Sequence, residues 1–121
     1  MKHVGKGPLD KAKSMCEKLS AFVPLPRNDQ ENTDLFAACL TLGFNHVALG
    51  ANDLKKEGVW VDLAGKPLNY TNWWTNDKIE PNNHGGNQHY LRYWPRFNGK
   101  WDDGEGYSVA NIVCGKLIVN G

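Results

Sequence analysis

The amino-acid sequence predicts an α+β fold in which two helices precede a set of short strands. Residues 10–19 and 28–43 place apolar side chains at helical spacing. After residue 43 the chain consists of short runs rich in β-branched and aromatic residues, separated by Gly, Asn and Asp. Helices followed by strands are typical of the α+β class. A length of 121 residues is enough for one hydrophobic core, so we expect residues 1–121 to form a single domain.

The first predicted helix covers residues 10–19, with Asp10 as its expected N-cap. It ends before the two prolines of residues 22–27, because proline cannot continue a helix. Its predicted apolar face consists of Ala12, Met15, Cys16 and Leu19.

The second predicted helix covers residues 28–43. Asn28 and Glu31 have the spacing of a capping box, although Asn only partly fits that pattern, and Gly43 is expected to end the helix. Its predicted apolar face consists of Leu35, Phe36, Cys39, Leu40 and Leu42.

The predicted strands are residues 46–50, 59–63, 89–94 and 109–119. The long connection between the second and third strands is expected to be functional, because long loops in compact domains are usually functional or disordered, and Trp73 and Trp74 argue against disorder. The segment IEPNNHGGNQHYL at residues 79–91, which runs from this loop into the third predicted strand, is rich in side chains with amide or carboxylate oxygens. These oxygens are candidates for contact with solvent, a metal or a polar ligand, and they belong to Glu80, Asn82, Asn83, Asn87 and Gln88.

Composition excludes several classes of function. The formal net charge of +1 gives no attraction to nucleic acid or to an anionic membrane. No apolar run approaches the roughly 20 residues that a membrane span requires. The His and Cys residues lack the close spacing of a zinc site, and no nucleophile–base set or acid–base pair stands out. We therefore expect a binding protein that is not an enzyme, with no nucleic-acid partner and no membrane insertion.

Several segments occur in an order and at spacings that resemble the C-type lectin-like domain, closest to the mannose-binding collectin type. They are AKSMC (12–16), PRNDQEN (26–32), VALG (47–50), EGVWVDLAGKPLNYTNW (57–73), EPN (80–82), WDD (101–103) and IVCGK (112–116). The resemblance covers nearly the whole chain. It implies two helices packed on short antiparallel sheets, with a long calcium-binding loop region. It also implies a secreted, extracellular protein, although Met1 opens a polar stretch and not a signal sequence.

The resemblance implies a Ca²⁺ site made by Glu80, Asn82, Gln88, Asp102 and Asp103. These oxygen donors suit a hard cation, and the family has a cis peptide before the proline that stands here as Pro81. The residues expected to contact sugar are Glu80, Asn82, Gln88, Asp102 and His84. Glu-Pro-Asn accompanies mannose-type sugars in the family, so the expected partners are mannose-type glycans on cell or microbial surfaces. Binding at one such site should be weak, at about 4 kcal/mol, so tight binding would use several copies, as in a homo-oligomer.

Two residues depart from the family pattern at this site. Gln88 stands where the family has Glu, and Asp102 stands where it has Asn. The two changes cancel in charge and exchange hydrogen-bond roles, because an amide can both coordinate and donate whereas a carboxylate only accepts. The alternative is drift in a domain that has lost metal binding and binds protein, ice or mineral instead. Residues 80–87 would then be a solvated Asn/Gly turn.

A second, weaker metal site is implied at Asp53, Glu57 and Asn83. The family has acids where this chain has Asn83 and His89, so we expect the calcium site to be weak or empty. The alternative is that Asp53 and Glu57 belong to a surface turn.

Cysteine usage also follows the family in part. The resemblance pairs Cys16 with Cys114, while Tyr90 and Gly106 stand in the places of a second bridge. Cys39 is left over, either as a buried thiol or as the source of an intermolecular disulfide. Asn69 lies in a glycosylation sequon that has meaning only in a secretory compartment.

Overall fold

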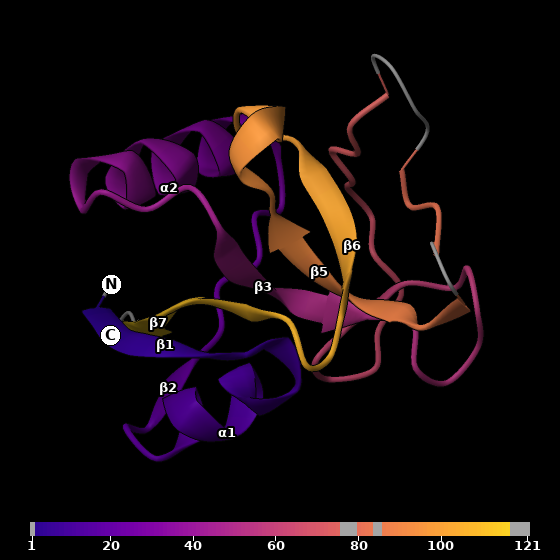
Figure 1. Ribbon diagram of the computed structural model, residues 1–121, viewed down its shortest axis with the longest axis horizontal. Helices are drawn as coiled ribbons and strands as arrows, with labels where there is room; N and C mark the ends of the chain where they lie inside the picture. The colour runs from indigo at the N-terminus through magenta and orange to yellow at the C-terminus, as the bar shows by residue number, and fades with distance from the viewer. Residues whose placement is uncertain (1, 76–79, 84–85, 117–121) are drawn as a thin grey trace.

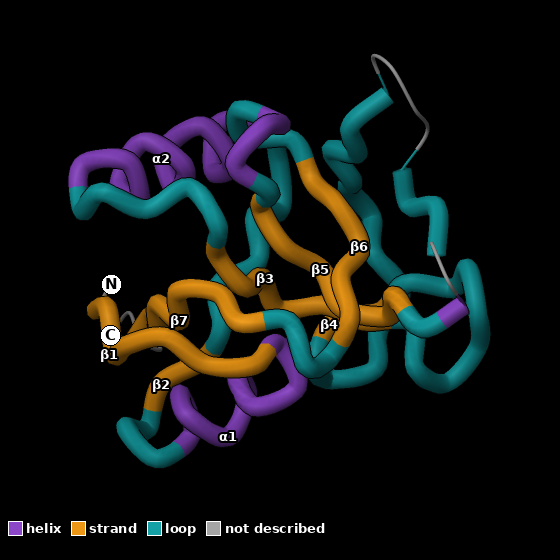
Figure 2. Tube along the Cα trace, viewed as in Figure 1, coloured by secondary structure: helices purple, strands orange, loops and turns teal. Residues whose placement is uncertain are grey.

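The computed structural model describes residues 2–75, 80–83 and 86–116. Within them a mixed sheet lies between two helices (Figures 1 and 2). The elements in chain order are β1 (Lys2–Pro8), the 3₁₀ turn η1 (Leu9–Lys11), α1 (Ala12–Glu17), β2 (Ala21–Phe22), α2 (Asp29–Thr41), β3 (Val47–Asn52), β4 (Val61–Asp62), β5 (Gln88–Tyr93), η3 (Pro95–Phe97), β6 (Trp101–Glu105) and β7 (Val109–Lys116). The predicted α+β class is confirmed.

The main path of the sheet runs in the order β1-β7-β3-β5-β6. The pairs β1–β7, β3–β5 and β5–β6 are antiparallel, whereas β3 and β7 are parallel. The short strands β2 and β4 pair with β7 and β3. Strands β1 and β6 were not expected from the sequence, because neither has the apolar alternation of a half-buried strand. Pairing with a neighbouring strand satisfies their backbone groups instead.

Each helix covers its own apolar cluster, and Figure 1 shows the two helices on opposite sides of the sheet. Under α2 the core includes Cys39, Leu91 and Trp101, with Leu35 and Phe36 packed against it. Beside α1 the core includes Ala12, Cys16 and Ile112. Among the described residues, neither helix has the length and hydropathy needed to cross a lipid bilayer.

The first helix is shorter than predicted, and Asp10 is not its N-cap. Lys11 occupies the N-cap position, and no side chain caps the helix. The preceding turn η1 is held by tertiary contacts, because the backbone N–H groups of Leu9 and Asp10 donate to the carbonyl oxygens of Ser108 and Gly106. The expected apolar residue Leu19 lies beyond the helix and is 45% exposed.

The capping prediction for α2 is confirmed in a modified form. The Asn28 side chain accepts a hydrogen bond from the Glu31 backbone N–H at 2.8 Å. The Glu31 carboxylate accepts from the Arg27 N–H at 2.8 Å, one residue earlier than a capping box prescribes. The predicted apolar face was wrong for Leu40 and Leu42, which are 50% and 46% exposed near the end of the helix.

Asn32 on α2 fixes the helix to two strands of the sheet. Its side-chain oxygen accepts hydrogen bonds from the Tyr93 hydroxyl and the Trp101 indole N–H, each at 2.9 Å. Its amide nitrogen donates to the carbonyl oxygen of Gly99 at 2.9 Å. Trp101 immediately precedes Asp102 and Asp103 on β6, so these hydrogen bonds also hold the two aspartates in position.

The disulfide between Cys16 and Cys114 is present, as the resemblance implied, and it closes a sequence separation of 98 residues. Closing a loop of this length stabilises the fold by about 4–5 kcal/mol in the chain-entropy model. Cys39 is a free and fully buried thiol, and burial raises its pKa to about 11. A buried, protonated thiol is inert, which favours the buried-thiol alternative over an intermolecular disulfide.

Candidate functional site

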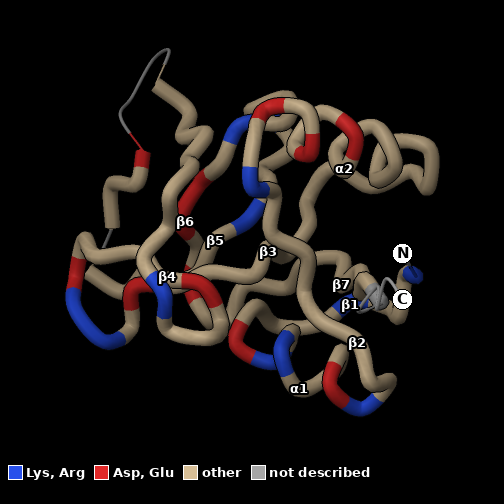
Figure 3. The backbone as a smooth tube through the Cα atoms, turned by 180° about the vertical axis from the view of Figure 1, so that it is seen from behind, with Lys and Arg blue, Asp and Glu red and all other residues tan. Residues whose placement is uncertain are grey.

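Three buried carboxylates converge where the loop at residues 80–83 meets strand β6. One oxygen from each of Glu80, Asp102 and Asp103 lies within 4.8 Å of the others. The three residues are 2%, 5% and 1% exposed. Figure 3 shows acidic positions on β6 and on the neighbouring loops. Buried carboxylates are costly unless they are paired, hydrogen-bonded or bound to a cation, so this cluster is a candidate cation site.

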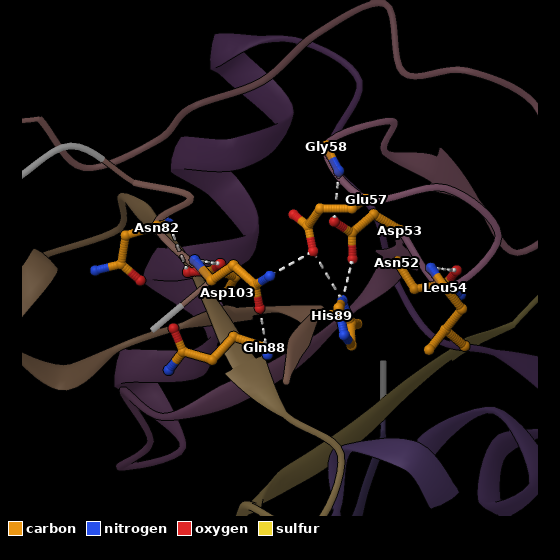
Figure 4. Close-up of polar contacts among 10 residues, drawn as sticks. Asn52, Asp53, Leu54, Glu57, Gly58, Asn82, Gln88, His89 and Asp103 are labelled. Atoms are coloured by element: carbon orange, nitrogen blue, oxygen red, sulfur yellow. Dashed lines mark hydrogen bonds and ion pairs between the residues drawn. The ribbon is translucent and has the colours of Figure 1, made fainter. Parts of the chain in front are cut away.

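Asp103 anchors the loop that carries Glu80. Its two carboxylate oxygens accept hydrogen bonds from the backbone N–H groups of Asn82 at 3.2 Å and Asn83 at 2.5 Å (Figure 4). The peptide bond between Glu80 and Pro81 is cis, as the resemblance implied. The Asn82 amide donates to a Glu80 carboxylate oxygen at 3.3 Å, so both side chains lie on the same side of the proline.

Asp102 has a cationic partner that the sequence analysis did not identify. One of its carboxylate oxygens accepts from Arg92 Nη2 at 2.8 Å and from Nε at 3.1 Å. The two side chains are only 6% and 7% exposed, and they face each other because Arg92 and Asp102 are paired residues of β5 and β6. The guanidinium also donates to the Ser108 hydroxyl and lies 4.2 Å from the ring centroid of Trp94.

Gly104 makes room for this arginine. A Cβ atom at position 104 would lie 2.9 Å from both Cδ and Cζ of Arg92, which is closer than real Cβ contacts. The glycine on β6 therefore allows the guanidinium to lie against the strand and reach Asp102.

Crowding of the carboxylates changes their acidity. Burial, followed by hydrogen bonding with Asp103 and Asp102, raises the pKa of Glu80 to about 8. Burial also raises the pKa of Asp102, although Arg92 acts in the opposite direction. At neutral pH a cation in the cluster would therefore compete with a proton on Glu80.

Gln88, the fifth predicted ligand, starts β5 and is 7% exposed. Its amide nitrogen donates to the carboxylate of Glu105 at 3.2 Å, across the β5–β6 ladder. Its backbone N–H donates to the side-chain oxygen of Asn83 at 2.8 Å. From the sequence, Gln88 and Asp102 are expected to exchange hydrogen-bond donor and acceptor roles. In the structure each has a further partner, because Gln88 donates to Glu105 and Asp102 accepts from Arg92.

A second cluster forms beside the first, from the residues after β3 and the start of β5 (Figure 4). Nδ1 of His89 lies 3.0 Å from a carboxylate oxygen of Asp53 and 3.4 Å from one of Glu57. Asn83 joins through its amide nitrogen, which donates to Glu57 at 2.5 Å. Partial desolvation and the neighbouring Asp53 raise the pKa of Glu57. The predicted second set is therefore assembled, with His89 as a member that the sequence analysis did not count as a ligand.

A ring–backbone contact replaces the second bridge of the family pattern. A Cβ atom at Gly106 would lie 3.0 Å from Cε1 of Tyr90, so the tyrosine ring packs against the glycine backbone. This contact joins β5 to the turn after β6 without a covalent link. His84, the remaining predicted sugar contact, lies outside the described residues.

The sequence model of the lectin C-type domain matches residues 6–116 of this chain. The chain belongs to the C-type lectin domain family. Members of this family are generally binding proteins, not enzymes, and are typically extracellular.

Similar solved structures show the C-type lectin fold over most of the chain. The carbohydrate-recognition domain of mouse scavenger receptor C-type lectin is 23% identical, with a TM-score of 0.81, covering 93% of this chain and 85% of that chain. That of cow CD23, determined in the presence of a GlcNAc2Man3 oligosaccharide, is 25% identical, with a TM-score of 0.81, covering 96% and 84%. A calcium-independent type II antifreeze protein is 18% identical, with a TM-score of 0.76, covering 93% and 80%.

The solved structures that are similar to this chain therefore include both carbohydrate-recognition domains and a calcium-independent antifreeze protein. The fold alone does not distinguish these activities, because function depends on the residues of the site.

Proposed function

We propose that this C-type lectin domain binds mannose-type sugars through a Ca²⁺ ion held by Glu80, Asn82, Gln88, Asp102 and Asp103. The observation that carries the proposal is the convergence of three buried carboxylates on the loop in which Glu80 and Asn82 flank a cis proline. Calcium takes about 6–8 oxygen ligands from carboxylates and amide carbonyls, and the five side chains are of these types. The residues therefore fit the ion.

Glu80 and Asn82 supply the specificity in this proposal. A bound calcium ion would supply direct coordination of two neighbouring sugar hydroxyl groups. Glu80 can only accept a hydrogen bond from a hydroxyl, whereas the Asn82 amide can donate one while its oxygen coordinates. In the structure that amide group already lies against Glu80, so one hydroxyl could contact both residues. The order Glu-Pro-Asn supports mannose-type over galactose-type sugars.

Arg92 modifies the metal-binding properties of Asp102. The guanidinium occupies one carboxylate oxygen and offsets the charge, so Asp102 resembles the Asn that the family has at this position. With Glu80 ionised, as calcium binding requires, three carboxylates and one guanidinium give the cluster a formal charge of minus two. Because ligand charge is a main determinant of calcium affinity, we expect moderate affinity for calcium.

The same arginine supports a second candidate function, which is calcium-independent binding of a protein, ice or mineral surface. A guanidinium already balances part of the carboxylate charge without any metal. A domain of this kind would keep its binding activity in a chelator.

Extracellular location and multivalency complete the proposal. The disulfide between Cys16 and Cys114 suits an oxidising compartment. A single shallow sugar site binds at about 4 kcal/mol, so useful affinity for mannose-type glycans on cell or microbial surfaces would come from several copies of the domain.

Isothermal titration calorimetry with calcium, followed by a glycan panel with and without EDTA, tests the proposal. Glu80→Gln should weaken calcium and abolish sugar binding, whereas Glu17→Gln, an exposed control on α1, should change neither. Sugar binding that survives EDTA unchanged would favour the calcium-independent candidate. Stronger inhibition by galactose than by mannose would overturn the sugar assignment.

A further inference from the structure

We infer that the Asp53, Glu57 and His89 cluster binds a zinc-class transition-metal ion, separately from the calcium proposed at Glu80. The cluster combines an imidazole nitrogen with two carboxylates. His89 belongs to β5, whereas Asp53 and Glu57 lie in the segment after β3. The sequence spacing of His and Cys gave no indication of a zinc site, because the three residues meet only in the folded chain.

The backbone holds the three donors in place. The Asp53 N–H donates to the carbonyl oxygen of His89 at 3.1 Å, which fixes the end of β3 against the start of β5. One Asp53 carboxylate oxygen accepts from the Gly58 N–H at 2.9 Å, and the other faces Nδ1 of His89 (Figure 4). The amide nitrogen of Asn83 donates to the same Glu57 oxygen that faces Nδ1 of His89.

The donor spacing fits a small tetrahedral ion. Nδ1 of His89 lies 3.0 Å from the Asp53 oxygen and 3.4 Å from the Glu57 oxygen. Ligands at about 2.0–2.2 Å from a tetrahedral Zn²⁺ ion lie about 3.3 Å from one another. Three protein ligands with one open position are a common arrangement for zinc, and Glu57, whose side chain is 54% exposed, leaves a route from solvent.

The donor types disfavour calcium. Calcium takes about 6–8 oxygen ligands and has little affinity for nitrogen, whereas this cluster offers two carboxylates and an imidazole. Imidazole is a preferred ligand of zinc, copper and nickel. Asn83 presents an N–H to Glu57 where an oxygen ligand for calcium would be needed. His89 thus changes the class of metal and does not simply weaken a calcium site.

Zinc calorimetry and Co²⁺ absorption spectroscopy, both in saturating calcium, test this inference on the intact chain. Co²⁺ replaces zinc and reports its own coordination, so neither measurement depends on sugar binding. The wild type should bind one equivalent of Zn²⁺ and give the intense visible bands of tetrahedral Co²⁺. His89→Asp and Glu57→Gln should each weaken zinc at least about tenfold, and His89→Asp should also bind calcium more tightly here.

Two variants serve as controls. His3→Gln removes a histidine that packs against Phe44 and does not belong to this cluster, so zinc affinity should stay unchanged. Glu80→Gln should weaken calcium and abolish sugar binding but keep the cobalt spectrum, which separates this inference from the proposed function. Equal zinc affinity in the wild type and His89→Asp would overturn the inference. A Co²⁺ spectrum of a six-coordinate, fully hydrated ion would also overturn it, leaving His89 and Asp53 as a structural pair.

Discussion

Arg92 and Asp102 form the contact whose removal has the clearest consequences for this domain. We consider Arg92→Met, Asp102→Asn and the double variant, compared with the wild type. At 2.8 Å, two unit charges attract by about 6 kcal/mol at an effective dielectric constant of about 20, before desolvation is subtracted. Removing one member of a buried pair costs about 3–5 kcal/mol, because the other charge stays buried without compensation.

In EDTA we therefore expect Arg92→Met to lower the free energy of unfolding by about 3–5 kcal/mol. For a domain of this size the midpoint of thermal unfolding should fall by about 12–20 °C. Asp102→Asn should cost less, since an amide oxygen still accepts from the guanidinium. The double variant should lose at least about 2 kcal/mol less than the sum of the single variants.

Calcium affinity should change in a different order from stability. Arg92→Met leaves three uncompensated carboxylates and a formal charge of minus three, so calcium should bind roughly tenfold more tightly. Asp102→Asn leaves the cluster with a formal charge of minus one and should bind calcium most weakly of the four proteins. The double variant restores the formal charge of minus two, so its calcium affinity should resemble that of the wild type.

Urea unfolding with EDTA and with calcium, together with calcium calorimetry, measures both quantities for all four proteins. Arg27→Met is the matched control, because Arg27 forms an ion pair with Asp62 but its side chain is 56% exposed. That pair should contribute about 1 kcal/mol or less, and its loss should leave calcium affinity unchanged. Additive losses in the double variant, or equal calcium affinities in the two single variants, would refute the reasoning.

Three further outcomes follow from the structure. The pKa of Glu80 is raised from 4.5 to about 8, so its contribution to metal-free stability is complete below pH 4.5 and is lost as pH rises through 8. Calcium affinity should show the opposite trend and fall about tenfold per pH unit below pH 8, because the proton must leave before calcium binds. Calcium calorimetry against pH on the wild type and Glu80→Gln measures this, and equal profiles would count against it. Gln88→Glu places a carboxylate opposite Glu105 across the β5–β6 pair and should lower the free energy of unfolding by about 1 kcal/mol in urea titrations, a loss that should disappear when Glu105 is changed to Gln. Asn32→Ala removes the acceptor of two buried donors and should cost about 3 kcal/mol, whereas a loss below 1 kcal/mol would show that water replaces it.

The sequence by itself determined the features that depend on neighbouring residues. Asn28 caps α2 because its side chain reaches an N–H only three residues away. The α+β class follows from the periodicity of apolar residues. The cis peptide before Pro81 and the pairing of Cys16 with Cys114 were implied by resemblance, and both are present. Asp10 and Leu42 show the limit of local patterns, because tertiary contacts replaced the predicted cap and the end of α2 is open to solvent.

Only the tertiary structure decided which charges meet at the two clusters. Arg92 contacts Asp102 because the β5–β6 register pairs them and because Gly104 leaves space for the guanidinium. His89 meets Asp53 because the start of β5 is hydrogen-bonded to the residue after β3, 36 positions earlier in the chain. Side-chain pairing across strands depends on register, and a shift of one residue would turn each side chain to the other face of the sheet. Residue types alone therefore identify the donors, whereas the register determines which donors share a site.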